Sequence, residues 1–500
     1  MRNLTYLLLT ASSLFLSASV SPNTPETIIF SSSFENVLGT SFDLKVKAVS
    51  ETVADQAEAV ALAEIDRLSG ILSSYDANSE FSRWQKTQNK SISTSPELMQ
   101  VFQLFDTWKQ KTTGALDPAV GAAIDVWKKA AKLNQKPDHQ SINEAVLAIQ
   151  KPHWALDVAE GTATHLSNTS LVLNSFTKSY VLEMVATRLV AIPGITGVAV
   201  NIGGDICIKG NLEEKVTVAN PIAQSDNIAA QDILLLINKT IATSANYKRG
   251  FSINGEWFSH IIDPRNGMPA NQVLSATVIA DKATDAGALA TAFNVLTPVE
   301  SAALAESEQV AYQLVLADGS ILSNELWHNL IGEPTSKPAT PNAAVAKDKE
   351  WDKNFEVAIN FELARFEGRF RRPFIAVWVE DSKKNTVKTL ALWYNKPRWL
   401  PDLKEWYRKN NGRYSPETKD IATISSATRP AGSYTLKWDG KTEDGSWVEA
   451  GNYTIYIEAA REHGTYQLMK QEVFCKGKPQ EFTLPGNIEV TAASVAYKKK

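Results

Sequence analysis

The sequence predicts an α+β domain over residues 30–332, followed by an all-β, sandwich-like domain over residues 351–500. In the first part, segments with apolar residues at helical spacing alternate with short segments that have strand spacing. In the second part, short strands follow one another with turns such as Asp439-Gly440 between them, a pattern typical of a β-sandwich. Residues 333–350 contain three prolines and no apolar periodicity, which predicts an extended linker between the domains.

The N-terminus predicts a signal peptide over residues 1–20. Arg2 is followed by an apolar run from Leu7 to Leu16 and then by small residues, in the order of a secretory signal. The run is too short for a comfortable membrane span, and an uncleaved anchor is the alternative. We therefore expect an exported, periplasmic protein.

The composition limits the partners and the redox chemistry. A formal net charge of -4 over 500 residues gives no basic field, so we expect no nucleic-acid partner. The two cysteines, Cys207 and Cys475, lie far apart in the sequence. They predict neither a disulfide scaffold nor a cysteine metal site.

The first domain is expected to begin with a strand over Phe34–Val46 that is interrupted at Leu38. A helix over Thr52–Leu72 then leads to a loop with Tyr75, whose aromatic ring beside polar residues suits a planar ligand. The alternative is an ordinary connecting loop. The next expected elements are a helix over Pro96–Thr113, a helix start at Asp117-Pro118, a helix over Ser141–Gln150, and strands at Ala155–Asp157 and Ser170–Leu173.

The stretch Leu173–Asp205 links a lysine to a glycine turn. An apolar-periodic helix begins close to Lys178, ends at Pro193, and is followed by a strand that ends in Asn201–Asp205. Backbone N–H groups and the dipole at a helix N-terminus favour an anion, so the arrangement suits a phosphate-bearing ligand. The alternative is a solvated lysine next to a plain hairpin.

Polar residues gather again after a predicted hairpin at Asn254-Gly255, where the returning strand leads to His260, Asp263 and Arg265. A helix of small residues follows and would approach another backbone or a ligand closely. The other expected elements of this domain are strands at Val216–Ala219, Ile241–Tyr247, Ser275–Ala280 and Ala311–Leu316, and helices near Ala230–Leu236 and at Asp285–Ala292. The expected strands of the second domain are Phe355–Phe361, Phe374–Glu380, Val387–Trp393, Tyr434–Trp438, Asn452–Glu458 and Glu472–Cys475, with a helix only at Trp399–Arg408.

Short motifs follow one another in a fixed order along residues 34–330. They are Leu38-Gly39-Thr40; Leu72 to Tyr75 with Ser79-Glu80; Asp117-Pro118 to Trp127; Lys178 with Tyr180; Asn201 to Asp205; Thr243-Ser244 with Tyr247; His260 to Arg265 with Gly267; and Ala288 to Ala292. In this order they resemble the ApbE family of FAD:protein FMN transferases. The second domain, with Arg372-Pro373 and Val377 to Asp381, looks like an uncharacterised domain of exported proteins, and its last strands look like an immunoglobulin-like module.

The resemblance implies a reaction. Members of the family bind FAD as a substrate, use Mg²⁺, and move FMN to a Thr or Ser hydroxyl of a partner protein as a phosphoester, with release of AMP. In such a reaction a divalent cation offsets charge on the phosphates and a base takes the hydroxyl proton. The expected partner is a flavin-acceptor protein. Contact with a membrane is expected only through exported redox partners, and no partner is predicted for the second domain.

The resemblance also assigns roles to individual residues. Contacts with the isoalloxazine or adenine are expected from Leu38, Tyr75, Asn201, Gly203, Gly204 and Asp205. Contacts on the phosphate side are expected from Lys178, Thr243, Ser244 and Arg265, with Asp117 as a further cofactor contact. His260 is the expected base, Asp263 its orienter or a second base, and the expected metal ligands are Thr177, Asp285 and Thr291.

Two departures from the family pattern affect the metal side. The family has a Lys-Gly pair where this chain has Lys178-Ser179, and an aspartate four residues before the threonine where this chain has Gly287. Asp285 is roughly 120° away from Thr291 around a regular helix. Either the helix begins later and Asp285 reaches in from a loop, or the metal site is weakened; Gly287→Asp is then expected to raise magnesium-dependent activity.

Other readings separate by experiment. One alternative is a periplasmic FAD-binding protein or FAD pyrophosphatase without protein transfer. A second is a carbohydrate-binding or structural surface protein built around the aromatic-rich sandwich, which would leave the ordered motifs unexplained. A third is self-modification at Ser425–Thr428, a segment that resembles flavin acceptor sites only loosely.

Overall fold

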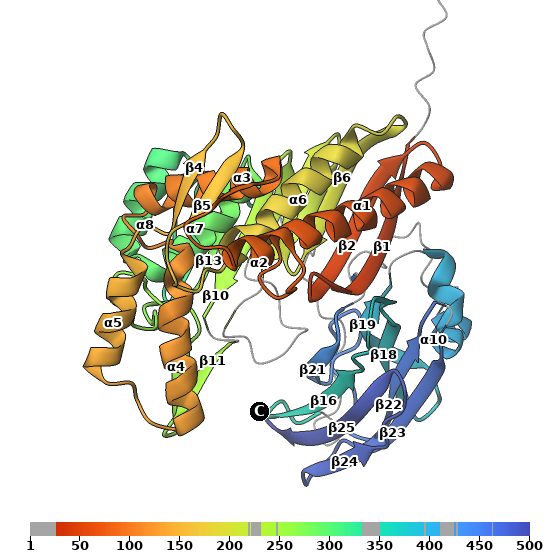
Figure 1. The fold of residues 1–500 in the computed structure, drawn as a ribbon. Helices are drawn as coiled ribbons and strands as arrows, with labels where there is room; N and C mark the ends of the chain where they lie inside the picture. Colours follow the sequence, from red (N-terminus) through yellow and green to blue (C-terminus); the bar gives the residue numbers. More distant parts are fainter. Residues whose placement is uncertain are drawn as a thin grey trace, which may run out of the picture.

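The computed structural model describes residues 27–218, 221, 232–246, 249–332, 351–394, 397–410, 425–426, 429–462 and 464–500 (Figure 1). The predicted signal peptide, the predicted linker, Tyr247 and the Ala427-Thr428 part of the third alternative lie outside these residues. Within them, no helix combines the length and the apolar character needed to cross a membrane.

The first domain is built on one antiparallel sheet. Its strands lie in the order β15-β14-β13-β10-β7-β6-β2-β1-β17. Their bounds are β1 Ile28–Val37, β2 Thr40–Ala48, β6 Ile195–Ile202, β7 Asp205–Gly210, β10 Thr240–Ala245, β13 Val273–Ala280, β14 Ala311–Leu316, β15 Ile321–Ser323 and β17 Phe370–Arg371. The sheet brings the ends of β6, β7 and β10 together, although they are distant in sequence.

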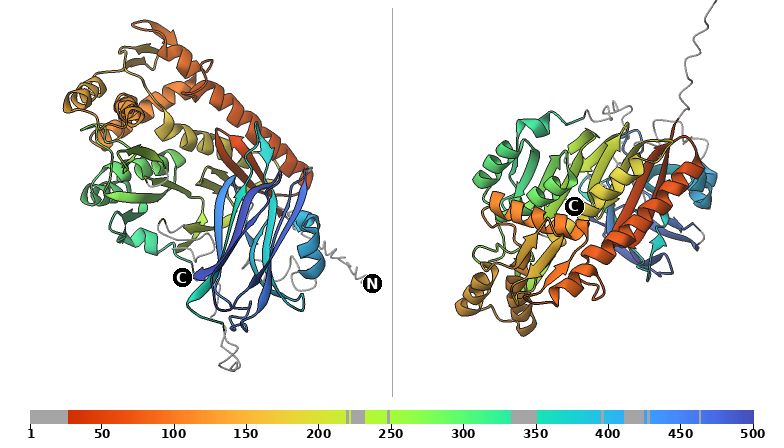
Figure 2. Two further views of the ribbon diagram at one scale, coloured as in Figure 1. Left: turned by 90° about the horizontal axis from the view of Figure 1, so that it is seen from below. Right: turned by 45° about the horizontal axis from the view of Figure 1, so that its top comes forward.

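Three helices cover one face of this sheet: α1 (Glu51–Leu72), α6 (Asn174–Val190) and α7 (Ala283–Val295) (Figures 1 and 2). The alternation of β2 explains why, because Phe42, Leu44 and Val46 are buried in the core shared with these helices while Asp43 and Lys45 face the other side. That side is partly covered by β8 (Glu213–Val218), β9 (Asp232–Ile237) and α9 (Glu325–His328).

The remaining elements of the first domain surround this layer. They are α2 (Glu80–Gln85), α3 (Pro96–Lys111), η1 (Pro118–Val120), α4 (Gly121–Leu133), α5 (His139–Ile149), α8 (Pro298–Glu308), the sheet of β3 (Ser91–Ser93), β5 (Thr162–His165) and β4 (Trp154–Asp157), and the hairpin of β11 (Gly250–Ile253) and β12 (Glu256–Ser259). Both turn residues of that hairpin, Asn254 and Gly255, have positive φ (53° and 79°), as the predicted Asn-Gly turn requires.

The second domain is a sandwich of two sheets. One has the order β21-β16-β25-β24 and the other the order β20-β19-β18-β22-β23, and apolar side chains of both meet in one core. The strands are β16 Phe355–Leu363, β18 Phe374–Asp381, β19 Thr386–Trp393, β20 Ser425–Ser426, β21 Gly432–Trp438, β22 Asn452–Ala460, β23 Tyr466–Phe474, β24 Gln480–Leu484 and β25 Val490–Lys499. The segments η3 (Pro397–Asp402) and α10 (Lys404–Asn410) cover the outer face of β18 through Trp378 and Trp406.

The two domains share a sheet edge. β17, which comes from the second domain, pairs antiparallel with β1, so Phe34 lies opposite Arg371 and Glu35 opposite Phe370. Figure 2 shows the sandwich beside the β1 end of the sheet. This pairing closes an edge that would otherwise present unpaired N–H and C=O groups.

The predicted fold class, an α+β domain followed by an all-β sandwich, is confirmed, but two predicted elements are wrong. The segment predicted as a helix near Ala230–Leu236 contains the strand β9, because a short apolar run does not distinguish a strand from a buried helix. Ser170–Leu173 is not a strand; the partner of β4 is β5 instead.

Candidate active site

The Gly203-Gly204 turn between β6 and β7 lies directly against Lys178. Both glycines have positive φ (63° and 102°), and the N–H of Gly203 donates to the Ser41 carbonyl at 2.9 Å. A Cβ on Gly203 would lie 2.7 Å from Oγ1 of Thr40 and 3.2 Å from Nζ of Lys178. A side chain therefore does not fit at this position, and the turn brings bare backbone close to the lysine ammonium.

The charges of Lys178 and Asp205 act on each other beside this turn. Burial lowers the pKa of the Lys178 ammonium, and the Asp205 carboxylate opposes that change. Burial raises the pKa of Asp205 to about 6, although the hydrogen bond from the Thr243 N–H and the charge of Lys178 both act to lower it. An anionic ligand at this turn would be attracted to the ammonium form of Lys178.

The strand β10 adds Thr243 and Ser244 to the same site. The N–H of Thr243 donates to Oδ1 of Asp205 at 3.1 Å, and the Thr243 hydroxyl lies 3.0 Å from that of Thr277. Asn294 on α7 donates through Nδ2 to the Ser244 carbonyl at 2.9 Å. The structure therefore brings together Lys178, the glycine turn, Asp205 and Thr243, which the sequence predicted as one site.

Tyr75 lies over the beginning of α6. Its side chain is 85% exposed, and its hydroxyl accepts a 2.9 Å hydrogen bond from Nδ2 of Asn174, the first residue of that helix. Helix α6 begins without a side-chain cap, and in its first turn the N–H groups of Phe176 and Thr177 donate to the Leu173 carbonyl. Leu38 occupies the β1–β2 turn with a φ of 51° and is partly buried against the main core.

His260 is half-buried and has one fixed nitrogen. Nδ1 lies 2.9 Å from the Arg249 carbonyl, and because a carbonyl only accepts, Nδ1 carries the proton. Burial lowers the pKa of His260, which favours the neutral ring. Nε2 then holds a lone pair, as a general base requires.

Asp263 does not orient His260, which corrects that prediction. Its carboxylate accepts from Nε and Nη2 of Arg265 at 2.9 Å and from the Arg265 N–H at 2.9 Å, while Arg249 supplies the acceptor for the histidine. Arg265 also lies 3.5 Å from Glu300. Asp263 and Arg265 thus stabilise the His260–Gly267 loop, and their charges offset each other.

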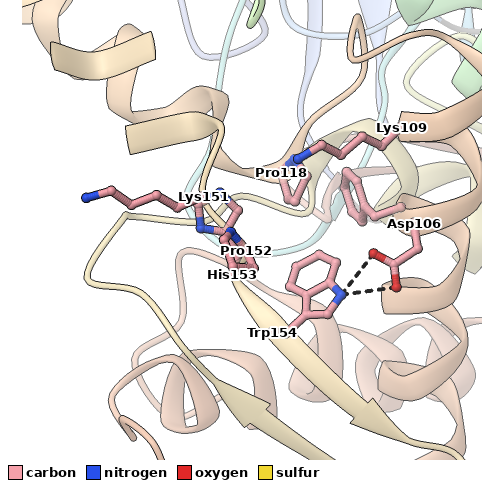
Figure 3. A pocket seen from close by; sticks show the side chains of 8 residues that line it. Asp106, Lys109, Pro118, Lys151, Pro152, His153 and Trp154 are labelled. Atoms are coloured by element: carbon pink, nitrogen blue, oxygen red, sulfur yellow. Dashed lines mark hydrogen bonds between the residues drawn. The ribbon is translucent and has the colours of Figure 1, made fainter. Parts of the chain in front are cut away.

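Asp117 is a structural cap. Its Oδ1 accepts from the N–H of Ala119 at 2.8 Å, and Oδ2 lies 2.6 Å from Nζ of Lys109. A pocket of about 150 Å³ adjoins this pair, and Figure 3 shows Trp154 donating to Asp106 in its wall. Ligand pockets for drug-sized molecules are typically about 300–1,000 Å³, so this pocket is too small for FAD.

On the metal side, Ser179 and Gly287, the two departures from the family pattern, are in contact with each other. A Cβ on Gly287 of α7 would be 1.9 Å from Oγ and 2.9 Å from Cβ of Ser179 on α6, closer than real contacts allow. The serine therefore occupies the space that a larger residue at position 287 would need. Gly287→Asp alone, which the sequence suggested as a restoration, collides with Ser179.

The remaining predicted metal ligands do not supply a carboxylate in its place. Helix α7 begins at Ala283, so the alternative in which Asp285 reaches in from a loop is wrong. The charged groups near Asp285 are Lys282, Lys111 and Glu308, and burial raises its pKa. The hydroxyl of Thr291 donates to the Gly287 carbonyl and that of Thr177 to the Leu173 carbonyl. Over the part of the chain that the structure describes, no three His, Cys, Asp or Glu side chains cluster as metal ligands. With Gly287 at the position of the family's aspartate, the expected ligand set lacks a carboxylate there and fits the family's cation only weakly.

Sequence reasoning missed three groups that shape the site. Arg249 fixes the histidine tautomer, Asn174 holds Tyr75, and Asp43 lies opposite Asn201 in the sheet and accepts from its Nδ2 at 3.1 Å. Of these, only Asp43 had a visible signal, as a polar residue within an alternating strand beside the first motif.

Comparison with known proteins finds relatives of both domains. A profile of the ApbE family matches residues 38–315, and one described as "Predicted periplasmic protein (DUF2271)" matches residues 356–492. The FAD:protein FMN transferase of Haemophilus influenzae is 29% identical over 299 residues, covering 56% of this chain and 84% of that protein. The enzyme of the same name from Vibrio cholerae is 28% identical over 267 residues, covering 51% of this chain and 78% of that protein.

Solved structures share the fold of the first domain. The ApbE protein of Thermotoga maritima superposes with a TM-score of 0.54 at 24% identity, covering 61% of this chain and 100% of that one. The apo flavinyl transferase ApbE of Pseudomonas stutzeri gives a TM-score of 0.52 at 21% identity, covering 62% of this chain and 98% of that one. Since the family profile spans more than half of the residues, the chain belongs to the ApbE family.

Proposed function

We propose that this chain is an exported FAD:protein FMN transferase, which moves FMN from FAD to a Thr or Ser hydroxyl of a partner protein. The observation that supports this best is the Lys178 ammonium beneath the Gly203-Gly204 turn, with Asp205 and Thr243 beside it. Bare backbone and a half-buried lysine in one place suit a ligand that carries both a planar ring and phosphates. The two relatives named above as FAD:protein FMN transferases, which align over this domain, support the same assignment.

In the proposed reaction, the acceptor hydroxyl oxygen attacks the phosphorus on the FMN side of the pyrophosphate. A phosphoester bond forms, the bond to the bridging oxygen breaks, and AMP leaves with that oxygen. Nε2 of His260 takes the hydroxyl proton, because Nδ1 is committed to the Arg249 carbonyl. Lys178 offsets the negative charge that develops on the phosphate oxygens.

Magnesium dependence, which the resemblance implies, is proposed here only in a weakened form. When bound, the cation would supply charge neutralisation at the phosphates. Position 287 has no carboxylate, however, and Ser179 fills the space. We expect Mg²⁺ to stimulate turnover less than it would with an aspartate at that position; a chelator titration against FAD turnover measures this.

The proposal is tested with the purified mature chain, FAD and an acceptor domain that carries a target threonine. A covalent adduct with the mass of FMN and an equal amount of AMP is the expected result, and His260→Ala is expected to lose both products. AMP without an adduct would support the alternative, an FAD pyrophosphatase without protein transfer. Bound FAD with neither product would leave only a carrier and would refute the transferase.

Export is part of the same proposal. It is supported by the signal-like N-terminus and by the match of residues 356–492 to a family described as periplasmic. Fractionation of cells that express the full chain, with detection of the processed N-terminus by mass spectrometry, tests it. An unprocessed chain in the cytoplasm would contradict it.

A further inference from the structure

Arg372 of the second domain is buried in the first one. It follows β17 directly, and its side chain is only 2% exposed. Nε donates to Oε1 of Glu35 on β1 at 2.5 Å, and Nη1 donates to Oδ1 of Asp43 on β2 at 2.7 Å. One guanidinium thus bonds two carboxylates from neighbouring strands, a charge-assisted arrangement that fixes geometry well.

From Asp43 the hydrogen bonds continue to the glycine turn. Oδ2 of Asp43 accepts from Nδ2 of Asn201, its direct neighbour across β2 and β6. Oδ1 of Asn201 accepts from the N–H of Gly204 at 2.9 Å. The chain of bonds therefore runs from Arg372 through Asp43 and Asn201 to Gly204.

The direction of each bond is set by chemistry. An arginine only donates and a carboxylate only accepts, so the Asn201 amide is oriented with its nitrogen towards Asp43 and its oxygen towards Gly204. Loss of the positive charge would leave Asp43 and Glu35 close to each other, with only the Ser33 hydroxyl, which donates to Oδ1 of Asp43 at 2.7 Å, and the charge of Arg365 near Glu35 to offset their repulsion. The acceptor that orients Asn201 would then be held less firmly, and the restraint on the turn would weaken.

We propose that Arg372 is a positioning residue for flavin binding, by which the second domain holds the Gly203-Gly204 turn in place through Asp43 and Asn201. The consequence for flavin rests on the proposed function; the consequence for the turn does not. The second domain then contributes to the flavin site, because a chain without it would lack Arg372. Isolated first domains would need another group to orient Asn201.

Two other arginines cross the same interface and provide matched controls. Arg369 lies 2.6 Å from Asp66, and Arg371 lies 3.0 Å from Glu58. Both carboxylates belong to α1, on the helix layer, and neither bonds the glycine turn. Loss of these ion pairs weakens the interface without breaking the bonds to Asn201.

The test uses the full chain and the substitutions Arg372→Met, Arg372→Lys, Arg369→Met and Arg371→Met. Hydrogen exchange of the segment 201–206 is measured first, without flavin. Arg372→Met is expected to speed exchange of the Gly204 amide about tenfold, roughly the effect of one lost hydrogen bond. Arg372→Lys is expected to recover part of the protection, and the two control substitutions to stay within about twofold of the parent.

Flavin binding is measured next, by fluorescence titration with FAD and by the separate changes in KM and kcat. Arg372→Met is expected to raise Kd and KM for FAD about tenfold and to leave kcat within about threefold, since no group at the reacting phosphorus changes. If Arg372→Met does not fold, Asp43→Asn is used instead. It keeps the size but leaves one acceptor oxygen, which cannot serve both Arg372 and Asn201, so the chain of bonds is interrupted.

Two outcomes overturn the inference. One is unchanged exchange at Gly204 in a folded Arg372→Met or Asp43→Asn chain. The other is equal loosening by Arg371→Met, which would make the effect a general one of the interface. If the parent chain fails to bind FAD while the exchange result holds, the proposed function has failed and the positioning of the turn has not.

Discussion

The contact between Ser179 and Gly287 allows a direct test of how the metal side has changed. In Gly287→Ala the new methyl would meet Oγ of Ser179 at 1.9 Å and its Cβ at 2.9 Å. Rotation of the hydroxyl removes only the first of these contacts, so α6 and α7 must move apart. Overpacking of a buried contact costs about 1–3 kcal/mol, which corresponds to a fall in melting temperature of roughly 2–5 °C for a domain of about 300 residues.

The double variant Ser179→Gly/Gly287→Ala removes the collision. Ser179→Gly alone is expected to lower the free energy of unfolding, because glycine is a poor helix former, but by less than about 1 kcal/mol. If the two positions exchange volume as inferred, the double variant is more stable than the sum of the single effects by about 1–3 kcal/mol. Chemical denaturation without flavin and without Mg²⁺ measures all four proteins, so the result does not depend on function.

The same pair then tests the chemistry. Ser179→Gly/Gly287→Asp is expected to bind Mg²⁺ more tightly than the parent and to show a larger stimulation of FAD turnover, whereas Gly287→Asp alone is expected to be destabilised. Isothermal titration with Mg²⁺ and activity in chelated buffer measure these effects. Additive stabilities in the alanine cycle, or a stable and Mg²⁺-responsive Gly287→Asp single variant, would refute the account of exchanged volume.

Three further predictions concern the flavin and base side. His260→Asn is expected to lower transfer about 100-fold or more while FAD still binds, and the parent rate is expected to fall as pH drops through a pKa below 6.5, because burial lowers the pKa of His260; a flat acid limb would contradict this. The folded-state pKa of Asp205, raised to about 6 from 3.8, means that the folded protein holds a proton that the unfolded chain has lost between these values. The free energy of unfolding should therefore fall as pH rises from about 4 to about 6. Asp205→Asn should be more stable than the parent at pH 8 but not at pH 3.5, and the gain at pH 8 should be at most about 3 kcal/mol because the carboxylate is only half-buried. Urea denaturation of both proteins across this pH range measures the effect, and equal pH profiles of parent and variant would contradict it. Tyr75→Ala is expected to leave stability unchanged, because the ring is 85% exposed, and to weaken FAD binding about 3- to 10-fold by loss of an aromatic contact; unchanged affinity would remove Tyr75 from the site.

Local signals were sufficient for much of the fold. Asp117, the predicted helix start, accepts from the N–H of Ala119 at 2.8 Å, and Asn254-Gly255 forms the expected hairpin turn. Both features depend on residues only a few positions apart. The strand β9 was missed because its apolar run fits a helix and a strand equally well.

The sequence predicts the parts of the site whose geometry depends on one residue type. It does not predict contacts between residues that are far apart in sequence. Gly203 had to be small and Lys178 had to lie near it, and both expectations agree with the geometry of the turn. Arg372 bonds Asp43 although 329 positions separate them, and no local pattern indicates that pairing. Asp263 was misassigned as an orienter for a similar reason, since its preference for Arg265 over His260 depends on how the loop closes.

The bonds from Arg372 end on the turn that faces the flavin side, whereas the Ser179–Gly287 contact lies between α6 and α7 on the metal side. Lys178 and Ser179 are neighbours in sequence, but in a helix they point about 100° apart, Lys178 towards Gly203 and Ser179 towards Gly287. We therefore expect the two changes to be separable: Arg372→Met alters Gly204 exchange and FAD affinity with no change in the Mg²⁺ response, and Ser179→Gly/Gly287→Asp does the reverse. Combined in one chain, their effects on FAD turnover should multiply to within about twofold. A Mg²⁺ response that changes with Arg372→Met would instead mean that α6 itself shifts when the second domain loosens, and the two halves of the site would have to be treated as one unit.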